Sequence, residues 1–244
     1  MSPQNHFPSL DALDVDGTVR QAAEDAGALD RRSLLRRGAL VGGGAVITSG
    51  MFGAMLSPAQ AAIVNGKHSA ANDVAVLKYA LTLEYLEAAF YSQALLNITF
   101  KNEQNRFFAR VVAAHEKEHV STLRTVLGRK KISSPTFNFG DAVKDEAKFM
   151  ATAQVLEDTG VAAYAGQGGN LSERKVIIAA LSIHSVEARH AAWARWLNGG
   201  FAPGSADKSP APVSFDVAVN ESDTLAAVGA TGFIVPSSTS ASPK

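Results

Sequence analysis

The sequence contains no cysteine among its 244 residues. This excludes disulfides, thiolate zinc sites, iron–sulfur clusters and a cysteine nucleophile. It also has no excess of charge of either sign, because 23 Lys and Arg are balanced by 23 Asp and Glu. Balanced charge removes the electrostatic basis for non-specific nucleic-acid binding, and we expect no nucleic-acid partner. Any metal ion must therefore be bound by histidine, aspartate or glutamate.

Residues 1–61 have the pattern of an export signal rather than of a folded domain. Arg31 and Arg32 precede an uncharged stretch from Gly38 to Leu56, and the small residues of Ala59-Gln60-Ala61 follow. Paired arginines followed by x-Leu-Leu resemble a twin-arginine signal. A membrane anchor is the alternative, but the six glycines of the stretch disfavour it. The pattern predicts the twin-arginine export machinery as a partner, a mature start at Ala62 and a periplasmic or extracellular protein.

Residues 62–198 form the predicted folded domain. Pro135 is the only proline between residues 72 and 198, and glycine-containing breaks separate four long segments, 72–98, 103–127, 141–165 and 171–198. We expect Asp141 to cap the third segment. The link over 128–140 can span roughly 40 Å at about 3.3 Å per residue, which is enough to cross the whole bundle. The predicted fold is therefore an all-α four-helix bundle, made of two antiparallel helical hairpins joined by a long crossover.

Residues 199–244 have a different composition, rich in proline, serine and glycine. We expect an irregular tail with at most one short strand, over 213–219.

Each helical segment has an apolar seam with heptad spacing, and near its middle each seam carries one glutamate. The four are Glu84, Glu116, Glu157 and Glu187. Moving even one carboxylate out of water costs several kcal/mol unless its charge is compensated, and gathering four adds mutual repulsion. Two divalent cations would offset the four negative charges. The pattern therefore predicts that the core holds two divalent metal ions.

The glutamates also belong to an internal repeat. Glu84-x6-Tyr91-x24-Glu116-x2-His119 is followed by Glu157-x6-Tyr164-x22-Glu187-x2-His190. A spacing of three residues puts carboxylate and imidazole on one helix face, where both can bind the same ion. One Glu-x-x-His is a weak signal, whereas two at matched distances after two seam glutamates are a strong one.

These residues resemble the ferritin-like di-metal carboxylate family over about 72–198. In that family two helices each give a glutamate and two each give Glu-x-x-His. The resemblance implies that iron or manganese is bound by Glu84, Glu116, His119, Glu157, Glu187 and His190. The sequence around the two tyrosines is most similar to the secreted ferritin-like branch that includes desiccation-related proteins.

Several neighbouring residues have more than one interpretation. Tyr91 and Tyr164 are candidates for hydrogen bonds to the ligand carboxylates or for redox chemistry, although a buried tyrosine with a polar partner is the commoner case. His184 is a candidate partner of Glu187 or an ordinary core histidine. Glu87 lies one turn from Glu84 and is a peripheral or bridging option.

The second helix also contains a competing motif, because His115-Glu116-x-x-His119 satisfies His-Glu-x-x-His of zinc peptidases. We rank this interpretation lower, since a peptidase needs a third ligand and a substrate cleft that is usually built with a sheet.

Two functions remain open. One is oxidation–reduction with oxygen or peroxide, as in a ferroxidase, an oxidase or a catalase. The other is a non-catalytic metal-binding or stress-protective protein. The sequence leaves homo-oligomer formation open.

Overall fold

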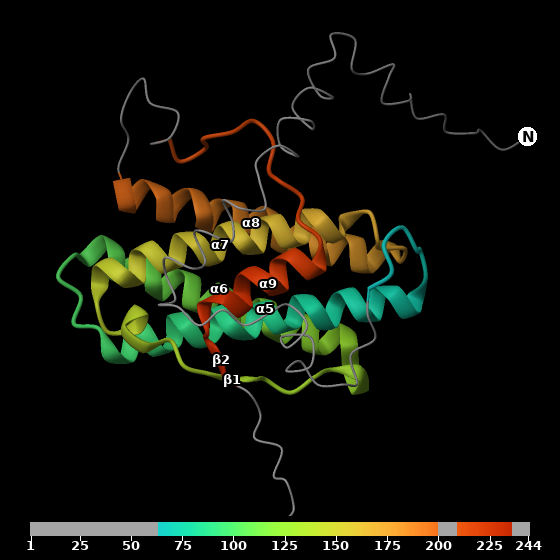
Figure 1. Ribbon diagram of the computed structural model, residues 1–244, viewed down its shortest axis with the longest axis horizontal. Helices are drawn as coiled ribbons and strands as arrows, with labels where there is room; N and C mark the ends of the chain where they lie inside the picture. Colours follow the sequence, from blue (N-terminus) through green and yellow to red (C-terminus); the bar gives the residue numbers. More distant parts are fainter. Residues whose placement is uncertain (1–62, 200–208, 236–244) are drawn as a thin grey trace, which may run out of the picture.

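The computed structural model describes residues 63–199 and 209–235. The predicted export signal and the end of the predicted tail lie outside these residues. Four long helices form the body of the protein (Figure 1): α5 (Ala70–Asn97), α6 (Glu103–Leu127), α7 (Glu146–Gly168) and α8 (Arg174–Gly199). They pack as a bundle, which confirms the predicted all-α fold class.

The helices begin at polar caps that satisfy free backbone N–H groups. The side chains of Ser69, Asn102 and Asp145 accept hydrogen bonds in the first turns of α5, α6 and α7. The prediction that Asp141 caps the third helix was wrong. Asp141 instead lies in a separate 3-10 turn, η2 (Gly140–Val143), whose last two residues are buried in the core. Burial of that turn delays the start of α7 to Glu146.

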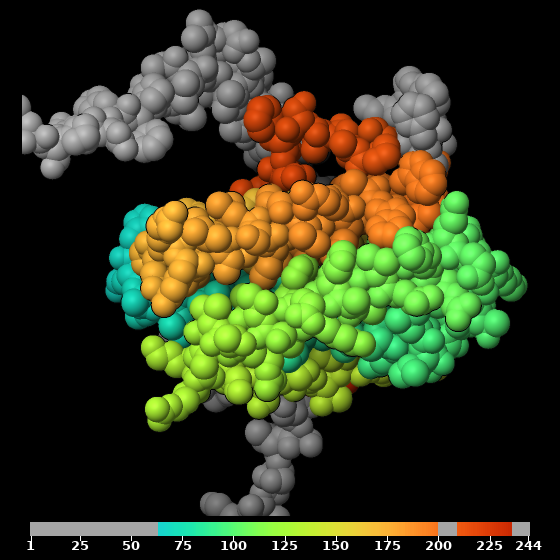
Figure 2. Space-filling view, turned by 180° about the vertical axis from the view of Figure 1, so that it is seen from behind, coloured from blue at the N-terminus to red at the C-terminus, as the bar shows by residue number. Residues whose placement is uncertain are grey.

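The helices form two hairpins, α5 with α6 and α7 with α8, and the chain between the hairpins runs along the length of the bundle (Figure 1). This crossover contains a 3-10 turn, η1 (Gly128–Lys130), the short strand β1 (Thr136–Phe137) and η2. On the opposite side of the molecule, α6 and α8 lie side by side, in green and orange in Figure 2.

The C-terminal tail is more regular than predicted. Residues 213–219 form no strand; the chain instead forms a helix, α9 (Glu221–Thr231), which packs on α7, and a strand, β2 (Ile234–Val235). β2 pairs antiparallel with β1, with Phe137 opposite Ile234. Hydrophobic burial explains the difference, because Val228, Phe233 and Ile234 join the core of the bundle.

Two apolar clusters fill the core on either side of the seam glutamates. One is centred on Phe90, Phe108 and Phe149, and the other contains Leu81, Leu123 and Ile183. Their buried side chains come mainly from opposite halves of the helices. Among the helices of residues 63–199 and 209–235, none is both long and apolar enough to cross a membrane.

Candidate metal centre

The four seam glutamates meet in the middle of the bundle, each from a different helix. Glu84 is 1% exposed, and Glu116, Glu157 and Glu187 are 0% exposed. The heptad spacing brings them to matching depth, because each lies near the middle of the inward face of its helix. The bundle thus places four carboxyl groups between its two apolar clusters.

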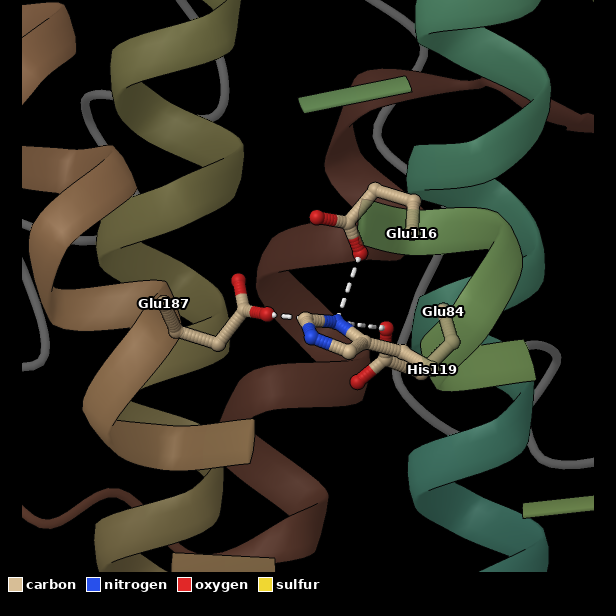
Figure 3. A group of neighbouring side chains, drawn as sticks. All are labelled: Glu84, Glu116, His119 and Glu187. Atoms are coloured by element: carbon tan, nitrogen blue, oxygen red, sulfur yellow. Dashed lines mark hydrogen bonds and ion pairs between the residues drawn. The ribbon is translucent and has the colours of Figure 1, made fainter. Parts of the chain in front are cut away.

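The first group of potential ligands surrounds His119 (Figure 3). Its Nδ1 lies 3.2 Å from Glu84 Oε2, 3.2 Å from Glu116 Oε2 and 3.0 Å from Glu187 Oε1. One atom from each of these four side chains lies within 4.8 Å of the others, so that they can hold one ion. Three helices, α5, α6 and α8, contribute to this position.

The second group surrounds His190. Its Nδ1 lies 3.2 Å from both Glu116 Oε1 and Glu157 Oε2, and 3.9 Å from Glu187 Oε2. These four side chains form another group that can hold an ion. Glu116 and Glu187 belong to both groups and offer a different oxygen to each. The six residues that the sequence predicted as metal ligands are therefore brought together as two adjoining positions.

Five buried atoms of this cluster make no well-oriented hydrogen bond: Glu116 Oε1, Glu157 Oε2, both carboxylate oxygens of Glu187 and Nδ1 of His190. Carboxylate oxygens and imidazole nitrogens lie 3.0–3.9 Å apart there, and they attract each other as ion pairs only when the imidazoles are protonated. Four carboxyl groups buried this close together need compensation, and a metal ion bound by carboxylates and an imidazole would provide it.

Two tyrosines hold the outer oxygens of the unshared glutamates. Tyr91 on α5 donates its hydroxyl to Glu157 on α7, while Tyr164 on α7 donates to Glu84 on α5 at 2.5 Å. Both bonds cross from one hairpin to the other. They fix the orientation of the two carboxylates and leave the inner oxygens facing the histidines.

The electrostatics of the cluster favour a mixture of protonated and ionised groups. Burial raises the pKa of Glu84 to about 8 and raises that of Glu187 well above its usual range. Burial would also raise the pKa of Glu116, but His119 and His190 outweigh it and lower that pKa to about 2. Burial would lower the pKa of His190, but the carboxylates of Glu116 and Glu157 outweigh it and raise that pKa to about 9. Without cations, the cluster thus holds protons in their place.

Glu87 is a fifth buried carboxyl group beside the cluster, 3% exposed. Burial and the nearby charges of Glu187 and Glu157 raise its pKa well above the usual range. The internal repeat places Gly160 at the position equivalent to Glu87. A Cβ at Gly160 would lie 3.4 Å from Glu87 Oε1 and 3.3 Å from Glu187 Oε2, so the glycine leaves room for both carboxyl groups. Glu87 belongs to neither of the two ligand groups.

The structure separates the histidines of the peptidase-like motif. His115 is exposed and belongs to neither group of potential ligands; its Nδ1 lies 2.8 Å from Nε2 of His190. The motif would require His115 and His119 to face one zinc ion, and only His119 faces the carboxylates. Sequence analysis missed the contact between His115 and His190, because no spacing on α6 reveals which residue of α8 lies opposite.

His184 is partly buried, and its Nε2 is buried without a hydrogen-bond partner. No hydrogen bond joins it to Glu187 within residues 63–199 and 209–235, so the structure provides no direct contact for the predicted partnership.

Comparison with known proteins identifies one family. A family model described as a ferritin-like domain matches residues 72–200, which is more than half of the chain. No curated protein matches the sequence.

Proposed function

This chain belongs to the ferritin-like domain family, and from that premise we propose that its bundle binds two divalent metal ions, iron or manganese. Glu84, Glu116, His119 and Glu187 hold one ion, and Glu116, Glu157, Glu187 and His190 hold the other. Mixed carboxylate and imidazole ligands suit either metal. The observation that supports this proposal most strongly is the convergence of six buried carboxylate and imidazole side chains from four helices into two groups that can each hold an ion.

The charges of the site support two divalent ions. Four ionised glutamates carry four negative charges, which two divalent cations offset, and the imidazoles bind as neutral ligands. Iron or manganese in this site would supply oxidation–reduction chemistry with oxygen or peroxide. The two apolar clusters on either side of the seam glutamates keep bulk water away from the carboxylates.

Glu87 is the proton carrier of the proposed site. Burial is the largest cause that raises the pKa of Glu87 well above its usual range in the metal-free protein, and a buried carboxyl group without a cation of its own favours the protonated form. Its Oε1 lies against the space left by Gly160, close to Glu187. A protonated carboxyl group there would hold a proton beside the ligand carboxylates, whose orientation Tyr91 and Tyr164 fix.

We also propose that the protein is exported by the twin-arginine route to the periplasm or the cell exterior and belongs to the secreted, desiccation-related branch of the family. The support for export is Arg31-Arg32, the uncharged stretch over 38–56 and Ala59-Gln60-Ala61. The support for the branch is the sequence over 83–91 and 156–164. That route transports folded proteins and would allow the metal ions to be loaded before export.

Metal analysis of the full chain tests the proposal. Protein purified from its native compartment without chelators should contain about two iron or manganese ions per chain, and its absorption spectrum should change when peroxide is added. Glu116→Gln should lower the metal content of both positions. Glu118→Gln is the matched control, since Glu118 lies on the same helix but is exposed.

Fewer than one ion per chain after loading, or equal losses in the two variants, would contradict the proposed site. Two ions with a spectrum that ignores peroxide would instead favour the non-catalytic metal-binding alternative.

A further inference from the structure

His115 contacts the metal centre from outside. It lies on α6 edge to edge with the ring of His190 of α8, with ring centroids 5.1 Å apart and an angle of 18° between the rings. Its Nδ1 lies 2.8 Å from Nε2 of His190, and the other nitrogen of His190, Nδ1, faces Glu116 and Glu157. His190 thus lies between the exposed His115 and the buried carboxylates.

We propose that His115 is a positioning residue, which orients His190 and strengthens metal binding at the position formed by Glu116, Glu157, Glu187 and His190. A neutral imidazole has one N–H and one free nitrogen. If Nδ1 of His190 is to bind a metal ion, its proton must lie on Nε2, where Nδ1 of His115 accepts it. This in-plane hydrogen bond selects both the tautomer and the ring orientation of His190.

The contact also makes the two metal positions unequal. In the internal repeat Val186 is equivalent to His115, because each directly precedes the glutamate of a Glu-x-x-His motif. A residue at this position would have to accept a hydrogen bond from the outer nitrogen of His119, and a valine side chain cannot do so. The ion pairs of His119 all use its Nδ1, and among residues 63–199 and 209–235 no side chain hydrogen-bonds its outer nitrogen. We therefore infer that the position at His190 binds metal more tightly than the position at His119.

This inference rests on the proposed function. It also gives a role to the first histidine of the peptidase-like motif. The first histidine of His115-Glu116-x-x-His119 holds a ligand of the other hairpin instead of binding the metal itself.

Titration of metal-free full-length protein with Co²⁺, followed by calorimetry and visible absorption, tests the inference. Wild-type protein should show two unequal binding steps. His115→Ala should weaken the tighter step about 10–100-fold, the usual effect of removing the outer partner of a histidine ligand. The other step should not change. His115→Gln, whose amide oxygen can accept the hydrogen bond, should restore most of the affinity.

His68→Ala is the matched control, since His68 is an exposed histidine that hydrogen-bonds the Leu171 carbonyl and is absent from both ligand groups. The unfolding midpoint of each metal-free variant shows whether a loss of affinity is only a loss of folding.

Two outcomes would overturn the role of His115 while leaving the proposed function intact: two wild-type steps that His115→Ala leaves unchanged, or a loss of equal size at both steps. A wild-type protein that binds no Co²⁺ would instead contradict the proposed function itself.

Discussion

At the scale of single residues, the site depends on hydrogen bonds that run from each half of the repeat to the other. Tyr91 of the first hairpin holds Glu157 of the second, and Tyr164 of the second holds Glu84 of the first. Each glutamate therefore has one oxygen fixed by a tyrosine and the other directed toward a histidine. Neither hairpin alone contains a complete ligand group, because every group combines residues from both.

Glu84 and Glu87 provide a direct test at this scale, since both are buried on α5 but only Glu84 belongs to a ligand group. We expect Glu84→Gln to lower the metal content from about two ions per chain to about one. Glu87→Gln should leave about two ions bound, because an amide replaces a carboxyl group that already carries its proton. Metal analysis after loading and desalting measures both.

Equal losses in the two variants would mean that Glu87 is itself a ligand, and that the repeat selects the wrong carboxyl group of α5. Unfolding of both metal-free variants serves as the control, because each substitution retains the size and burial of the side chain.

At the scale of elements, contacts between residues distant in sequence determine where α8 begins and where the tail docks. Asp73 of α5 accepts hydrogen bonds from the backbone N–H groups of Ser172 and Glu173 and from the Ser172 hydroxyl, just before α8 begins. A residue of the first helix thus caps the fourth. The tail is held similarly, since the backbone N–H of Val219 donates to the Ala162 carbonyl of α7 at 3.0 Å.

Gly166 is required where the tail crosses α7. A Cβ at this position would lie 1.8 Å from the carbonyl oxygen of Val219, which is too close for any side chain. We expect Gly166→Ala to lower the free energy of unfolding by about 1–3 kcal/mol and to expose the segment around Val219 to proteases. Thermal unfolding and limited proteolysis measure the two effects.

Gly168→Ala is the control for the same helix, because a Cβ there has no neighbour within 4 Å. Both variants should retain two metal ions, since the crossing is not part of either ligand group. Equal effects of the two substitutions would contradict the close approach of Val219 to Gly166, because only a side chain at residue 166 would meet the tail.

At the scale of the whole molecule, stability should depend on pH in opposite ways with and without metal. In metal-free protein, burial raises the pKa of Glu84 from 4.5 to about 8, so the folded state holds a proton that the unfolded state has lost. Its contribution to stability is complete below about pH 4.5 and is lost as the pH rises through about 8. His190, with its pKa raised from 6.5 to about 9, has the same sign.

Glu116 has the opposite sign, because its pKa is lowered from 4.5 to about 2, but its contribution is complete above about pH 4.5 and is constant over the neutral range. The free energy of unfolding of metal-free protein should therefore fall between about pH 5 and about pH 8.

Metal binding reverses this dependence, since the ions need ionised glutamates and neutral imidazoles and compete with protons for them. We expect the difference in unfolding midpoint between metal-loaded and metal-free protein to grow from about pH 5 to about pH 7.5. Thermal unfolding of both forms, with metal content measured at each pH, tests this. A difference that stayed constant or shrank would show that the buried glutamates do not bind the metal.

The sequence by itself determined the bundle and the candidate ligands of this protein. Heptad spacing identifies the inward face of a helix without knowledge of its partners, so Glu84, Glu116, Glu157 and Glu187 could be recognised as buried carboxyl groups. The three-residue spacing to His119 and His190 is likewise a local property of a helix. The short links over 99–102 and 166–170 were enough to predict two antiparallel hairpins, and the long link over 128–140 predicted the crossover between them.

Only the tertiary structure decided which side chains of different helices touch. The contact of His115 with His190, the space that Gly160 leaves for Glu87 and the close approach of Val219 to Gly166 all join residues distant in sequence. For the same reason the prediction for the tail missed α9 and placed the short strand at 213–219 instead of Ile234–Val235. Its composition indicated irregular chain, but α9 and β2 are stabilised by burial against the bundle, and that burial depends on a surface that exists only after the four helices have packed.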